Sequence, residues 1–183
     1  MSNQNSWKNG ALRSAKEVAR TAVFVAMVIG SQYALSAVPF VEVVSLLFIC
    51  YAFVFGVVRG TIAAVAFALL RQLLFGFYPV VLILYLVHFS MLSVVFGLLP
   101  RWCKWKGWKL LLIATLLAAA TAACFTLLDS LLTPWYYGYT PRAAELYFKA
   151  SLPFLFGQTV CACVSVAVLF LPLTKALIFV KKA

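Results

Sequence analysis

Long apolar runs, separated by short polar or proline-containing breaks, dominate the chain. The runs lie at about 19–37, 41–58, 61–77, 79–99, 110–133 and 151–180. Each is long enough for an α-helix that crosses a bilayer, which needs roughly 20 apolar residues. The pattern therefore predicts an all-α membrane protein whose six transmembrane helices form one bundle, with 1–183 as a single integral-membrane domain.

Turn residues and prolines mark several ends of these runs. The pair Arg59-Gly60 indicates a tight turn between the second and third runs, and Pro100 and Pro134 close the fourth and fifth. We expect a basic loop over 101–109 and an aromatic loop over 135–149.

Composition narrows the fold class further. Of 183 residues, 66% are hydrophobic and 10% are charged, whereas soluble domains are about 45–50% apolar and about 25% charged. An ordinary soluble fold and a disordered chain are therefore both excluded. The first run could pass for a secretory signal, since 34–37 loosely resembles a cleavage site. Its length and the membrane-like remainder favour a retained helix.

The net charge of +11 comes from fifteen Lys and Arg against four Asp and Glu. These charges form short clusters between apolar runs, which favours a membrane topology signal over nucleic-acid binding. With six spans, the clusters at 8–20, 59, 101–109 and 175–182 fall on one side. The positive-inside rule then predicts cytoplasmic N and C termini, with 1–18 as a basic cytoplasmic segment.

Strongly polar side chains inside the runs fall in the predicted outer half or at the membrane centre. The inner half offers only Ser, Thr and Cys until Lys175. This distribution predicts a cup that opens outward and is sealed below, with the aromatic loop as a lid. The candidate substrate-binding residues are Tyr33, Glu42, Arg71, Gln72, Tyr78, Tyr85, His88, Asp129, Trp135, Tyr137 and Gln158.

Each of these residues also has a purely structural interpretation. Glu42, Arg71 and Asp129 could pair with one another, as buried charges must. The aromatic residues of 135–139 are also typical of interfacial anchors. For His88, a satisfied interior histidine is favoured over a ligand contact.

Catalytic and metal-dependent functions find little support in the sequence. A single His without a nearby Cys partner argues against zinc, and Cys161 and Cys163 face different directions on a helix. We therefore expect no metal site. Four acidic residues, each isolated, make a membrane enzyme acting on lipids a weak alternative. The apolar inner half argues against a channel.

A stripe of alanines follows one face of the first predicted helix, at Ala11, Ala15, Ala19, Ala22 and Ala26. Small residues allow another helix to approach closely in lipid. The stripe begins in the basic cytoplasmic segment and runs into the membrane. It predicts a docking surface for another membrane protein, and internal packing of the bundle is the alternative.

These features together resemble the substrate-binding S-component of an energy-coupling-factor (ECF) vitamin transporter of the bacterial plasma membrane. In that family an Ala-x-x-x-Ala pattern contacts a transmembrane scaffold subunit. Ala22 to Ala26 matches best, and Ala15 to Ala19 offers a second copy. The resemblance implies a non-enzymatic binding subunit that works with the scaffold and two cytoplasmic ATPases. The chain has no Gly-x-x-x-x-Gly-Lys-Ser/Thr stretch of its own.

Three segments, 39–47, 55–56 and 74–77, are most similar to the group that takes up cobalamin. The resemblance therefore implies cobalamin as a transported ligand and no cofactor of the chain's own. On that basis Arg71 is expected to meet an anionic or amide group, and Tyr78, Trp135 and Tyr137 to give flat apolar contact. A queuosine precursor and riboflavin are the alternative nutrients.

Overall fold

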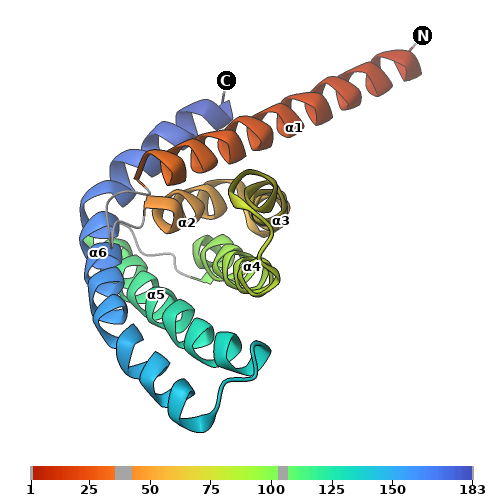
Figure 1. Ribbon diagram of the computed structural model, residues 1–183. Coiled ribbons are helices and arrows are strands. Elements are labelled where there is room, and N and C mark those ends of the chain that lie inside the picture. Colours follow the sequence, from red (N-terminus) through yellow and green to blue (C-terminus); the bar gives the residue numbers. More distant parts are fainter. Residues whose placement is uncertain (1, 36–42, 103–106, 183) are drawn as a thin grey trace.

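Figure 1 shows a computed structural model that describes residues 2–35, 43–102 and 107–182, with side chains from Ala15 onward. Within these residues the chain forms six α-helices and no strand. The helices are α1 (Ser2–Leu35), α2 (Val43–Phe55), α3 (Val57–Phe75), α4 (Pro79–Trp102), α5 (Trp108–Tyr136) and α6 (Pro141–Lys182). The predicted all-α fold is confirmed.

Five of these helices, all except α2, are long and apolar enough to cross a membrane. They indicate a multi-pass membrane protein. The 13 residues of α2 extend only about 20 Å at 1.5 Å per residue, less than the roughly 30 Å of a hydrocarbon core. The helix ends early because Gly56 has a positive φ of 88°, a conformation that side chains rarely adopt.

The predicted aromatic loop over 135–149 is wrong for most of its length, because only 137–140 lie outside helices. Pro141 can begin α6, since the first turn of a helix does not use its N–H groups. Thr140 caps that turn, as its hydroxyl accepts a 3.3 Å hydrogen bond from the Ala143 amide. The predicted helix ends at Pro134 and Pro100 are also wrong, because α5 and α4 each continue for two residues beyond the proline.

Helix α2 lies at the centre of the packing and contacts α1, α3, α4 and α6. The centroid of its Phe48 ring is 4.7 Å from the ring centroid of Phe89 in α4 and 5.4 Å from that of Phe67 in α3. Phe53 of α2 meets Phe170 of α6 at 5.2 Å. These rings belong to one hydrophobic core, here called the aromatic core. Helices α5 and α6 form a long hairpin that extends away from this centre (Figure 1).

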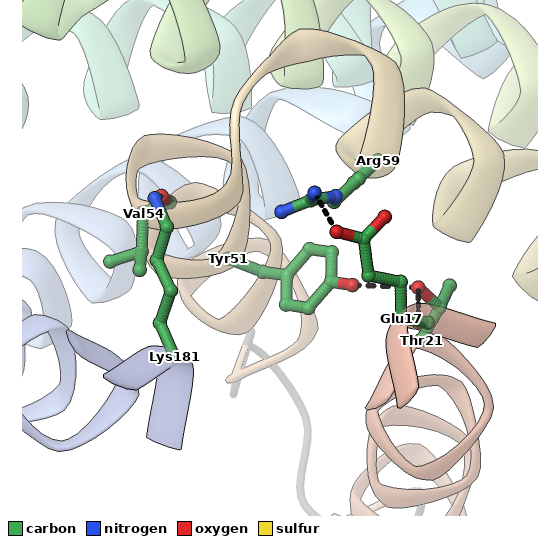
Figure 2. Close-up of polar contacts among 6 residues, drawn as sticks. All are labelled: Glu17, Thr21, Tyr51, Val54, Arg59 and Lys181. Carbon is green, nitrogen blue, oxygen red and sulfur yellow. Dashed lines mark hydrogen bonds and ion pairs between the residues drawn. The ribbon is translucent and has the colours of Figure 1, made fainter. Parts of the chain in front are cut away.

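One end of the bundle is held by a group of polar contacts, here called the junction (Figure 2). It consists of Glu17 and Thr21 of α1, Tyr51 and Val54 of α2, Arg59 of α3 and Lys181 of α6. Arg59 pairs with Glu17, and the Thr21 and Tyr51 hydroxyls share a 2.9 Å hydrogen bond. The Lys181 ammonium donates to the Val54 carbonyl over 2.6 Å. The α2–α3 turn and the end of α6 therefore meet α1 at the same end.

Glycines allow the helices to approach closely near this junction. A Cβ on Gly97 of α4 would lie 2.6 Å from the backbone nitrogen of Val57. A Cβ on Gly60 of α3 would lie 3.0 Å from the Cβ of Ser93. Any side chain at Gly97 must therefore displace the α2–α3 turn.

Candidate ligand-binding site

The predicted polar residues gather at the other end of the bundle, here called the polar half. The end that holds the junction and the aromatic core is called the packed half. Along α1, the fifteen residues from Glu17 to Gln32 separate the two ends by roughly 22 Å. The polar half contains Gln32 of α1, Arg71 and Gln72 of α3, Tyr85 and His88 of α4, Phe125 and Asp129 of α5, and Gln158 of α6.

The guanidinium of Arg71 meets aromatic rings instead of acidic groups. Its carbon lies 4.6 Å from the Tyr85 ring centre and 5.4 Å from that of Phe75. Its Nε and Nη1 are buried and have no hydrogen-bond partner. Within the described residues it forms no ion pair, so two buried donor atoms of this half-buried cation stay available to an anion or an amide oxygen.

Two glutamine side chains near Arg71 each have one amide atom with a hydrogen-bond partner and one without. The Gln32 Nε2 donates to the Tyr85 hydroxyl over 3.3 Å, while its Oε1 has no partner. The Gln72 Oε1 accepts from the Tyr78 amide at 2.9 Å, while its Nε2 has none. Because both groups are buried, each free atom carries a desolvation cost that a bound ligand would remove.

His88 is an interior residue, as one interpretation of the sequence expects, and it is only 1% exposed. Its ring packs against Phe125 and Phe89, with ring centroids 4.7 Å and 5.1 Å apart. The expectation of a satisfied histidine is not met, because Nδ1 has no hydrogen-bond partner. The imidazole therefore adds another available polar atom to the polar half.

A pocket of about 250 Å³ lies between α5 and α6. Asp129 lines it and accepts 2.8 Å hydrogen bonds from the hydroxyls of Thr133 and Tyr147. Gln158 also lines it, and its Oε1 accepts a 2.8 Å hydrogen bond from Thr126. Asp129 and Arg71 therefore do not pair with each other, since each contacts a different set of neighbours.

The remaining predicted residues lie at the surface. Tyr33 is 73% exposed and Trp135 is 79% exposed, and Tyr78 and Tyr137 are more than half exposed. The Tyr137 ring meets Tyr136 of α5 edge to face and stacks on Tyr139 of the α5–α6 turn. Glu42 lies outside the described residues, so its pairing and its ligand contact stay predictions.

Sequence reasoning missed Phe125, whose ring lies between the Arg71 group and the α5–α6 pocket. It lies 6.0 Å from the Tyr85 ring and also lines the pocket. Tyr147 was missed because it was assigned to a loop. Its spacing of four and eleven residues from Ser151 and Gln158 is the signal that could have placed all three on one helical face.

A separate apolar groove of about 970 Å³ runs between α1 and α3. Ala22 and Ala26 line it and are exposed, so the bundle itself does not cover them. Ala15 and Ala19 are also exposed but lie outside the groove lining. The side chain of Ala11 is not described.

The described residues include no group of three His, Cys, Asp or Glu side chains that could hold a metal ion. Comparisons of the chain with protein-family models, with curated proteins and with solved structures give no match. The geometry of the polar half and the sequence pattern are therefore the basis for a functional proposal.

Proposed function

We propose that this chain is the substrate-binding S-component of an ECF-type importer, which captures a vitamin at the outer face of a bacterial plasma membrane. One observation is the main support. Buried polar side-chain atoms without a partner concentrate in the polar half, and among the described side chains Ser93 is the exception. The set comprises Gln32 Oε1, Arg71 Nε and Nη1, Gln72 Nε2, His88 Nδ1 and Thr159 Oγ1.

Such atoms are rare in folded proteins and costly inside a bilayer. A ligand that presents hydrogen-bond acceptors and donors would satisfy them together. They lie on α1, α3, α4 and α6, which favours a ligand that contacts several helices over one that lies on a single helix.

The proposed topology has six crossings, with both termini in the cytoplasm. The junction end then faces the cytoplasm, because the basic clusters at 16–20, 59 and 175–182 lie on that side. The polar half faces outward, and the aromatic core closes the path below it. Release of the ligand inward would therefore need a rearrangement that other subunits drive.

Cobalamin is the first candidate ligand, because the resemblance noted above favours that group. Its phosphate suits the free donors of Arg71, and its amide groups suit the half-used amides of Gln32 and Gln72. A queuosine precursor and riboflavin are the alternatives. The same site would serve each of them through flat contact with aromatic rings.

The test is mass spectrometry of small molecules retained by the chain purified in detergent, with and without added cobalamin. Arg71→Ala and Arg71→Lys should each weaken binding of the retained or added vitamin by at least about tenfold, since Lys lacks the planar fork. Arg142→Ala, which removes an exposed cation near the same end, is the matched control and should bind normally. Normal binding by both Arg71 variants would make Arg71 structural and contradict the proposal.

Partner docking is tested separately by co-purification of the tagged chain from its own cells. A scaffold protein and two ATPases should be recovered. Ala22→Trp, which fills the α1–α3 groove, should prevent their recovery while vitamin binding is retained. Val164→Trp, on an exposed position of α6, is the control for the added bulk. Recovery that Ala22→Trp leaves unchanged would rule out this face as the docking surface.

A further inference from the structure

The α5–α6 pocket differs chemically from the Arg71 group. Phe125, Tyr147 and Phe154 give it aromatic walls, and Asp129 gives it a carboxylate. No basic side chain of the described residues lines it. The two parts of the polar half therefore have opposite charge, and the ring of Phe125 lies between them.

Asp129 is unusual among the acidic residues of the described chain. Glu17 pairs with Arg59, and Glu145 pairs with Lys149 at 2.6 Å. Asp129 instead accepts one neutral hydrogen bond at each carboxylate oxygen, from Thr133 and Tyr147. Each oxygen has a second lone pair available. A carboxylate within an apolar helix pair normally has a positive partner, and none is present among the described residues.

The size and lining of the pocket indicate what that partner is. Its volume is about 250 Å³, whereas a water molecule occupies about 30 Å³. A bare metal ion would leave most of the pocket to water. Aromatic faces attract a positive charge within about 6 Å, and cages of this type recognise alkylated ammonium groups. The volume is also below the roughly 300–1,000 Å³ of pockets for whole drug-sized ligands.

We infer that the α5–α6 pocket binds an organic ammonium group, with Asp129 as its counter-charge and Phe125, Tyr147 and Phe154 as its aromatic walls. The group belongs to a small ligand or forms one end of a larger one. Gln158 and Ser151 supply neutral oxygens at the same surface, so the hydrophilic end of such a ligand can hydrogen-bond beside the charge.

The test compares two probes that differ only in charge. Choline has a trimethylammonium group, and 3,3-dimethyl-1-butanol has a neutral tert-butyl group of the same shape. Binding of each to the full chain in an uncharged maltoside detergent is measured by equilibrium dialysis and by the shift of the unfolding temperature. Choline is expected to bind saturably and at least about tenfold more tightly than the neutral alcohol. Equal binding of both probes would overturn the inference.

Variants then locate the site. Asp129→Asn keeps the shape of the side chain and should weaken choline binding by at least about tenfold. Phe154→Leu removes an aromatic wall without touching the carboxylate, so it provides a second measurement if the Asn variant folds poorly. Glu145→Gln, which removes an exposed negative charge of the same helix, is the matched control and should bind choline like the wild type. Wild-type binding by the Asp129 and Phe154 variants would overturn the inference.

Two further arms define the ligand. Sodium chloride and tetrabutylammonium chloride are compared at equal concentration as competitors of choline, and the second salt has a cation too bulky for the pocket. If sodium chloride displaces much more choline, the site belongs to an inorganic cation and the inference is overturned. Nanodiscs of phosphatidylcholine that block choline binding, where phosphatidylglycerol does not, would identify a lipid headgroup as the source of the ammonium. Binding in both lipids would identify a free ligand.

This inference rests on the proposed function only for access to the polar half from the outer side. Its failure is distinguishable from the failure of the proposed function, because choline binding and vitamin retention are measured separately. A chain that binds choline and retains no vitamin would contradict the S-component proposal and support this pocket. A chain that retains a vitamin and does not bind choline would support the S-component proposal and overturn the inference about this pocket.

Discussion

The packed half and the polar half of this bundle differ in how their buried polar atoms are hydrogen-bonded. In the packed half, Thr115 and Thr174 donate to carbonyls one turn earlier in their own helices, at 2.9 and 2.7 Å. In the polar half, Arg71 and His88 keep buried atoms without partners. These two hydroxyls are satisfied within their own helices, and Ser93 is the exception in the packed half, whereas Arg71 and His88 keep atoms that a group from outside the chain could satisfy.

Stability and ligand binding therefore depend on different halves of the molecule. Substitutions in the packed half should cost folding free energy, since they remove packing. Substitutions in the polar half should cost little stability and change ligand affinity instead.

Phe67→Ala should have the largest effect on stability. The ring is fully buried and contacts Phe48 at 5.4 Å and Phe89 at 5.2 Å. Its removal leaves a cavity and should lower the free energy of unfolding by about 3 kcal/mol. Unfolding is measured by titration of sodium dodecyl sulfate into the chain in mild detergent. Phe179→Ala, at an exposed position of α6, is the control, and an equal loss there would contradict the distinction.

Gly97→Ala should cost about 2 kcal/mol of unfolding free energy, because the new methyl group overlaps the backbone of Val57. The same titration measures it. Gly30→Ala is the matched exchange in α1, where no atom lies within 4 Å of the added methyl group. That variant should be neutral or slightly stabilised, since alanine favours helix. Similar losses at both glycines would mean that close packing at Gly97 is not what stabilises this end.

His88→Phe should stabilise the ligand-free chain by about 1 kcal/mol, since it removes a buried nitrogen that has no partner. Phe89→His makes the reverse exchange one residue later, in the aromatic core, and should destabilise the chain. Unfolding titrations of both variants without ligand give the comparison. If His88→Phe is destabilising, the imidazole has a structural partner and is not available to a ligand.

The Glu17–Arg59 ion pair should contribute least, about 0.5 kcal/mol, because both side chains are about one-third exposed, at 34% and 31%. A double-mutant cycle with Glu17→Gln and Arg59→Gln measures the coupling energy. It should decrease as salt is added. A coupling above about 2 kcal/mol would show that the junction is much less hydrated than its exposure indicates.

The grouping of the polar residues could be predicted from their positions along the runs. Arg71, Gln72 and Gln32 are all late in outward-running predicted helices. Arg71 and Gln32 do both contact Tyr85, and Gln72 follows Arg71 directly in α3. Position along a helix sets height but not the direction that a side chain faces. That is why the possible pairing of Arg71 with Asp129 looked plausible, although their neighbours in the structure are different.

Helix boundaries were less predictable, because a proline can either begin a helix or lie near its end. Pro134 and Pro100 predict helix ends, yet each helix continues for two residues past its proline, so the missing N–H bond lies within the last turn. Pro141 lay inside a presumed loop, yet it begins α6. The sequence alone did not distinguish these cases, since the cap of Thr140 is a short polar contact and not a periodic signal.

The short, enclosed helix α2 has a consequence for how the chain reaches its membrane. Most of its residues are covered by α1, α3, α4 and α6, and its 13 residues are too few to cross a hydrocarbon core. In the proposed six-crossing arrangement, the insertion machinery would not retain α2 as an independent segment during synthesis. It would have to accept α2 and α3 together as a helical hairpin, and the enclosure of α2 would be completed only when the C-terminal end of α6 packs against it.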